Sequence, residues 1–226
     1  MSALRGRSGI ESDMILPMVY FRIMSIEDPF RSPGVASLCF RLLSRAQVMG
    51  FLPENVDEEM RLDRQLVGGV GERLARAGVA QEPAVLLANA ADSEERIADA
   101  LRRTIAAVDA SPHPDGEWAP ARELLGDELL ARLVRVSPSS LRRYATGVRP
   151  TPDAVAWRLH AVARILASLV GSYNAYGVRR WFERPRTALD GRAPAELVSA
   201  APTEEDAGLT RVLDLAESLT GAGAAA

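Results

Sequence analysis

The segment 117–150 constrains the fold most, because its apolar residues follow the spacing of two short helices that cross at a tight turn. Ser137 suits the N-cap of the second helix, Pro138 its first helical position, and Gly147 a left-handed residue at its end. Arg135 stands where glycine is common in the turn, and a positive φ there would cost about 1 kcal/mol. The pattern therefore predicts a helix-turn-helix. Its apolar positions are Leu130, Ala131 and Val134 on the first helix, Val136 in the turn, and Leu141 and Tyr144 on the second.

The second helix of this motif is the one expected to meet DNA, with its N-terminal half in the major groove. Arginine can donate two hydrogen bonds to O6 and N7 of guanine, and serine hydroxyls suit phosphates or bases. The alternative is a three-helix bundle whose arginines are merely solvated. The candidate DNA-binding residues are Ser139, Ser140, Arg142 and Arg143, with Arg149 just past the helix as a phosphate contact.

The charge of the chain is unevenly distributed. Between Arg135 and Arg192 there are 11 arginines against three acids, a net charge of +8, whereas the whole chain carries −3. The remainder must then carry −11. A basic middle in an acidic chain suggests an anionic partner for that segment. The alternative is that these arginines are solvated on helix faces.

A second pattern follows in residues 179–198, where the aromatic pair Trp181 and Phe182 is surrounded by arginines. Pro185 ends the helix that carries the pair, because its ring clashes with the preceding turn. Asp190 and Gly191 form a turn signal, and Pro194 suits the first turn of a new helix. The segment therefore predicts a short helix, an arginine-rich loop and a second helix, which together favour a contact surface.

The pattern W-F-x-x-P-x-x-x-L-x-G-x-x-P-x-E-L resembles the toxin-binding region of the MbcA/ParS/Xre antitoxins, which partner RES-domain toxins. The resemblance extends from about Glu117 to the end of the chain and departs at Asp190, where a second glycine is common, and at Arg186, where a small polar residue is common. The matching positions are Trp181, Phe182, Pro185, Leu189, Gly191, Pro194, Glu196 and Leu197.

The resemblance implies an antitoxin of a type II toxin-antitoxin pair. It implies that the toxin consumes NAD, that the antitoxin blocks the toxin's active-site cleft, and that the antitoxin represses its own operon by binding operator DNA. A homodimer within a larger toxin-antitoxin complex is expected. The alternative is a helix-turn-helix repressor, of host or prophage origin, without a toxin partner. For Trp181 the alternative is an ordinary core aromatic. The candidate toxin-binding residues are Trp181, Arg184, Arg186, Leu189 and Arg192.

The remaining segments complete an all-α, multi-helix prediction. Residues 1–59 read as a poorly defined leader, partly disordered or with a misassigned start, although 35–49 could form an amphipathic helix. Residues 60–112 are helical with no identified role, beginning with a helix whose apolar stripe starts at Leu62. The linker S-P-H-P-D-G, 111–116, marks the main boundary. We expect a helix-turn-helix domain over 113–175 and a toxin-binding domain over 176–226.

Residue types that carry catalysis are poorly represented. Cys39 is a lone cysteine, and His113 and His160 are far apart in sequence, so neither a disulfide nor a metal ligand set is expected. We find no phosphate-binding loop and no serine with a suitable histidine base. The apolar run 14–24 is too short to span a membrane and lacks a secretory cleavage site. We therefore expect a cytoplasmic protein that is not an enzyme and uses no cofactor or metal.

Overall fold

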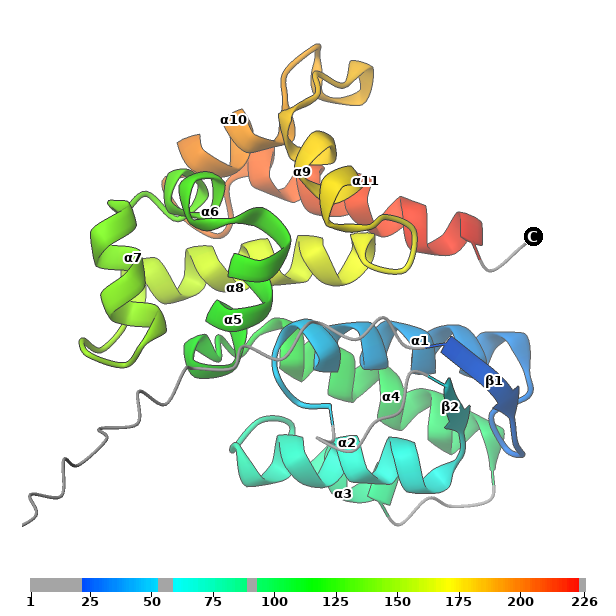
Figure 1. Cartoon of the computed structure of the whole chain (residues 1–226). Coiled ribbons are helices and arrows are strands. Elements are labelled where there is room, and N and C mark those ends of the chain that lie inside the picture. The colour runs from blue at the N-terminus through cyan, green and yellow to red at the C-terminus, as the bar shows by residue number, and fades with distance from the viewer. Residues whose placement is uncertain (1–21, 53–58, 89–92, 224–226) are drawn as a thin grey trace, which may run out of the picture.

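The computed structural model describes residues 22–52, 59–88 and 93–223, and most of these residues lie in helices. The predicted all-α, multi-helix class is confirmed (Figure 1). The N-terminal region consists of β1 (Arg22–Ile26), α1 (Pro33–Val48), β2 (Glu59–Leu62), α2 (Arg64–Arg76), α3 (Gln81–Ala88) and α4 (Glu94–Asp109). The C-terminal region consists of α5 (Pro114–Leu125), α6 (Asp127–Leu133), α7 (Pro138–Ala145), α8 (Asp153–Leu169), α9 (Ala175–Glu183), the 3-10 turn η1 (Thr187–Leu189), α10 (Pro194–Ala200) and α11 (Ala207–Gly223).

The N-terminal region is folded where the sequence suggested a leader. Strands β1 and β2 pair in parallel, and α1 is the crossover between them, as parallel pairing requires. Leu42 and Leu43 of α1 are buried, and so is Cys39, whose thiol has a pKa raised to about 12 by that burial. The helix expected within 35–49 is therefore confirmed. The leader prediction is wrong from Arg22 onward, and residues 1–21 lie outside the described residues.

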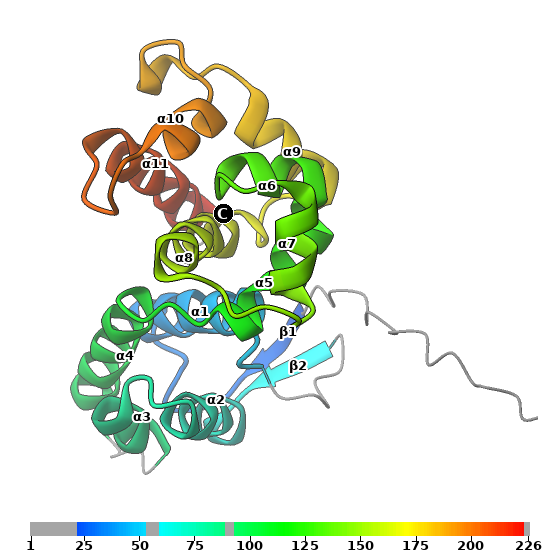
Figure 2. The ribbon, with the colours of Figure 1, turned by 90° about the vertical axis from the view of Figure 1, so that its left-hand side faces the viewer.

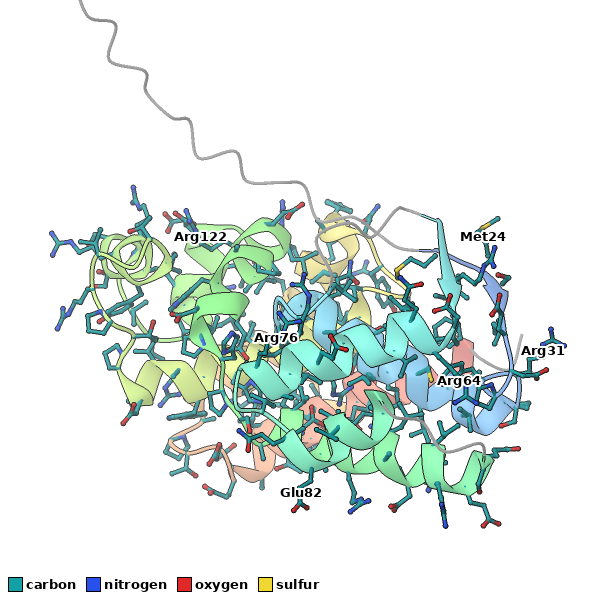
Figure 3. All side chains as sticks on the ribbon, turned by 90° about the horizontal axis from the view of Figure 1, so that it is seen from below. Met24, Arg31, Arg64, Arg76, Glu82 and Arg122 are labelled. Carbon is teal, nitrogen blue, oxygen red and sulfur yellow. The ribbon has the colours of Figure 1, made fainter. Side chains whose placement is uncertain are left out.

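Leu62 corrects a second prediction, because it lies on β2 and not on the following helix. The helix begins one residue after Asp63, whose Oδ1 accepts a hydrogen bond from the amide of Leu66 at 2.8 Å. Helices α2 and α3 then pack against each other as a hairpin, and α3 packs on α4. Figure 3 views this side of the molecule, where Arg64, Arg76 and Glu82 are exposed.

Helix α8 is the centre of the fold. Leu159, Val162, Ile165 and Leu166 are each fully buried. Helices α1, α5 and α11 pack around it, and both views place α1 beside α8 (Figures 1 and 2). A helix that is apolar on nearly every side must be covered by neighbours on every side. One hydrophobic core therefore runs through the N-terminal and C-terminal regions.

The segment 111–116 is a packed junction, which corrects the linker prediction. Pro114 begins α5, as proline at a first helical position can. A Cβ at Gly116 would collide with the carbonyl oxygen of Met49, so only glycine allows this approach to the end of α1. The rings of Phe51 and His113 stack with centroids 4.7 Å apart. Proline and glycine here serve a close contact between the two regions.

Candidate nucleic-acid and partner interfaces

Helices α6 and α7 and the turn between them lie where the sequence predicted the two helices and the turn of a helix-turn-helix. Ser137 is the N-cap of α7, and its Oγ accepts a hydrogen bond from the amide of Ser140 at 3.1 Å. The turn closes when the amide of Val136 donates to the carbonyl of Ala131 at 3.0 Å. Gly147 has φ 69°, which confirms the left-handed residue predicted there, and Arg135 has φ 59°, so the cost considered for a positive φ at this position applies. The arginine retains the strain that glycine would avoid, about 1 kcal/mol.

Helix α7 is fixed to the body of the protein by one face. Leu141 and Tyr144 are buried, and the Tyr144 ring stacks on Trp118 of α5 with centroids 6.2 Å apart. The indole Nε1 of Trp118 donates to Oγ1 of Thr151 at 3.0 Å, which holds the chain that leaves α7. The opposite face of α7 therefore points outward, at the edge of the molecule in Figure 1.

Four of the five candidate DNA-binding residues have exposed side chains, and the fifth, Ser140, is partly exposed. The serine hydroxyls are linked to one another. Ser137 Oγ lies 2.9 Å from Ser139 Oγ and donates to Ser140 Oγ at 3.0 Å. This cluster of hydroxyls sits at the N-terminal end of α7, where the helix dipole favours an anion.

The two arginines of α7 differ in their surroundings. Arg142 donates from Nε to the carbonyl of Pro138 at 3.2 Å and lies 3.6 Å from Oδ2 of Asp127. Asp127 is also bound by Arg122, whose Nε donates at 2.8 Å. Within the described part of the chain, the Arg143 side chain has no hydrogen bond or ion pair. Arg143 is therefore better placed than Arg142 to take an external phosphate or base.

Arg149 completes this surface from the turn after α7. Its guanidinium lies 5.8 Å from the centroid of the Tyr144 ring, so the aromatic ring orients the charge. Its amide donates to the carbonyl of Arg143 at 3.1 Å, which fixes the turn. The sequence analysis did not identify Asp127 as the ion-pair partner of Arg142, because no local sequence pattern relates the two residues.

The excess positive charge of residues 135–192 does not form one continuous surface. Arg179 donates from Nε to the carbonyl of Leu124 at 2.8 Å, and Arg158 donates to the carbonyl of Ala201 at 2.7 Å. Both carbonyls lie at helix C-termini, where cations satisfy unpaired acceptors. Arg164 lies 3.6 Å from a carboxylate oxygen of Asp109. Much of the predicted basic segment therefore holds helices together.

The second candidate interface is the loop from Glu183 to Ala193, between α9 and α10, which projects from the body in Figures 1 and 2. Helix α9 ends at Glu183, before Pro185, and α10 begins at Pro194, as predicted. Trp181 and Leu189 are each only 1% exposed, so the prediction that they face a toxin is wrong.

These two residues are buried because the apolar side of α9 and the underside of the loop face the core. The Trp181 ring packs edge-on against Phe182 with centroids 5.3 Å apart, and η1, which carries Leu189, packs on α11. Arg184 and Arg192 are exposed, and Arg186 is partly exposed with its guanidinium 5.4 Å from the Trp181 ring centroid. The arginines therefore form the outer surface of the loop and the apolar residues its support.

Helix α11 holds the loop in one shape. Arg211 donates to Oδ2 of Asp190 at 2.8 Å and to the carbonyl of Ala188 at 2.9 Å. The hydrogen bond and charge of Arg211 hold the pKa of Asp190 below its ordinary range, so this carboxylate stays ionised. Across the loop, the amide of Arg186 donates to the carbonyl of Arg192 at 3.0 Å. Sequence reasoning missed Arg211, because 21 residues separate it from Asp190.

A shallow hollow of about 280 Å³ lies where the loop meets the helix-turn-helix. Two of its lining residues, Arg132 of α6 and Glu183, form an ion pair at 3.4 Å. One exposed ion pair beside the hollow therefore links α6 to the start of the loop. The hollow is lined by Arg132, Glu183, Ala193, Ala195, Glu196 and Ser199.

Comparison with protein-family models, with curated proteins and with solved structures gives no match for this chain. Among the described residues, no group of three or more His, Cys, Asp or Glu side chains is arranged to hold a metal ion. None of the helices in the described ranges is long and apolar enough to cross a membrane.

Proposed function

We propose that this protein is an antitoxin that binds DNA through α7 and a RES-type toxin through the loop from Glu183 to Ala193. The observation that carries the proposal is the projecting loop. It bears the sequence pattern of the antitoxin family, and Arg211 fixes its conformation before any partner binds. A loop held in its binding shape loses less conformational entropy on association, which favours affinity. The exposed face of α7 on the same chain supports the operator-binding role.

In this proposal the two interfaces act only by covering their partners. The toxin-facing side chains are Arg184, Arg192 and the exposed part of Arg186, while Trp181 and Leu189 support the loop from beneath. Arginine is one of the residue types that most often contribute strongly at protein interfaces. The protein would act in the cytoplasm as a homodimer within a toxin-antitoxin complex, without catalysis or a cofactor.

Co-expression and co-purification with a RES-domain protein test the toxin-binding role. Each of Arg184→Ala and Arg192→Ala is expected to weaken the complex about tenfold, because each removes an exposed guanidinium from the loop. Isothermal titration calorimetry measures the change, and Arg103→Ala on the exposed face of the remote α4 is the matched control. If the wild-type proteins form no complex, or cellular NAD falls equally with and without this protein, the toxin-binding role is wrong.

DNA binding is tested by comparing the two arginines of α7. Arg143→Ala is expected to weaken specific binding to the upstream DNA by about 1 to 3 kcal/mol, because its guanidinium has no competing partner in the described protein. Arg142→Ala is expected to have a smaller effect, because Asp127 and the Pro138 carbonyl already hold that side chain. Gel-shift titrations over a salt series separate the two kinds of contact, because losing a phosphate contact reduces the salt dependence of binding whereas losing a base contact does not. Equal losses for both variants would contradict this assignment.

A repressor without a toxin partner is the second candidate, and the exposure of α7 favours it independently of the loop. For such a repressor, Arg184→Ala would leave DNA binding unchanged and no RES protein would be captured. For the antitoxin, DNA binding would also survive, but capture of the toxin would weaken. The pair of measurements therefore separates the two functions.

A further inference from the structure

Helix α11 contacts two distant parts of the protein with two charged side chains. Near its start, Arg211 holds the loop from Glu183 to Ala193 through Asp190 and the Ala188 carbonyl. Farther along, Glu217 accepts a hydrogen bond from Arg45 of α1 at 3.1 Å and lies 3.5 Å from Arg41. One helix thus connects a candidate binding loop with the N-terminal region.

The contact at Glu217 belongs to a buried charge cluster. Arg45 is only 2% exposed, and it donates to both carboxylate oxygens of Asp109, from Nε at 2.5 Å and from Nη2 at 2.9 Å. Asp109 also lies 3.6 Å from Arg164 of α8. A buried guanidinium that loses one of its carboxylates is strongly disfavoured. The position of Glu217, and with it the far part of α11, therefore depends on how α1 and α4 are docked.

The part of α11 that carries these two contacts is packed into the core. Leu209, Val212 and Ala216 are fully or almost fully buried, and α11 packs along α8. Arg211 and Glu217 are separated by six residues, a rise of about 9 Å along a helix. Tightly packed helices shift between discrete positions and do not bend gradually. A displacement of α11 at one contact is therefore transmitted to the other.

We propose that α11 couples the conformation of the loop from Glu183 to Ala193 to the docking of the N-terminal region on α8 and α11. In one state Arg211 and Glu217 both hold their partners. In the other, a ligand of the loop takes over Asp190 or Arg211, α11 shifts, and the Arg45 cluster opens. Coupling of this kind is reciprocal, so undocking of α1 also loosens the loop. The coupling needs no particular partner and does not depend on the proposed antitoxin function.

Hydrogen-deuterium exchange of the full chain without any ligand tests the coupling in both directions. Arg211→Gln changes an exposed side chain at the loop contact and is expected to speed amide exchange about fivefold or more in residues 184–192 and also in α1 near Arg41 and Arg45. Glu217→Gln changes the other contact and is expected to speed exchange in α1 and α4 and also in the loop. The reciprocal pair of responses would support the proposal.

Asp214→Asn is the matched control, because it removes a carboxylate from an exposed position of α11 that lies between the two contacts. It is expected to leave exchange in both the loop and α1 unchanged. The proposal is overturned if each variant loosens only the contact that it removes. Equal acceleration in α5 and α6 would also overturn it, because that pattern reports a loss of global stability.

Discussion

Asp109→Ala is expected to lower the free energy of unfolding by about 3 kcal/mol, because it leaves the buried Arg45 with Glu217 as its remaining carboxylate partner. Arg45 is 2% exposed, so water cannot replace the lost hydrogen bonds. The change also removes the carboxylate that faces Arg164. Urea denaturation followed by circular dichroism measures the difference. The midpoint urea concentration is expected to fall while the m-value, the dependence of the unfolding free energy on urea, stays constant.

Two further variants isolate the cause. Asp99→Ala removes an acid from the same helix, where its ion pair with Arg103 at 3.1 Å is exposed, and is expected to cost less than about 0.5 kcal/mol. The double variant Arg45→Met with Asp109→Leu removes both buried charges and is expected to be about 2 kcal/mol more stable than Asp109→Ala alone. A double variant no more stable than the single one would show that the unpaired charge is not the reason for the loss.

The elements that the sequence predicted correctly are those whose ends are set by interactions between residues close together in the chain. The N-cap at Ser137, the end of α9 before Pro185 and the start of α10 at Pro194 each depend on a proline or a side chain next to the affected backbone. The left-handed residue at Gly147, which ends α7, is likewise set by the local backbone. Local sterics and local hydrogen bonds decide these features, so a single sequence is enough to find them.

The polar junction between the two regions could not be predicted in this way. Arg45 meets Asp109 across 64 residues and Glu217 across 172 residues. His160 lies buried with Nδ1 2.6 Å from Oε1 of the buried Glu117. The apolar periodicity of a helix does not predict which charged residue will pair with which, because each of these polar residues leaves the apolar stripe of its own helix unchanged. Their pairing is a property of how the helices pack.

The error at Trp181 has a related cause. The sequence showed an aromatic residue beside arginines, a composition shared by binding surfaces and by amphipathic helices that bury one side. In the structure Val178, Trp181 and Phe182 form the buried side of α9, while Arg180 and Arg184 lie outside. The spacing of these residues on a helix, considered without the arginines, favours the core position.

Trp181→Ala is therefore expected to lower the free energy of unfolding by about 3 to 5 kcal/mol, the usual cost of emptying a large aromatic site in a core. Trp181→Phe is expected to cost much less, about 1 to 2 kcal/mol, because within the described part of the chain the indole Nε1 has no hydrogen bond to lose. Arg184→Ala, three residues later and exposed, is expected to leave stability within about 0.5 kcal/mol of wild type. Thermal and urea unfolding of the three variants distinguish a side chain that supports the fold from one that contacts a partner.

If Trp181→Ala were as stable as wild type and lost only partner binding, the indole would belong to the interface. The expected pattern instead has stability depending on Trp181 and partner affinity depending on Arg184, since the loop presents its arginines only while the indole beneath it remains packed.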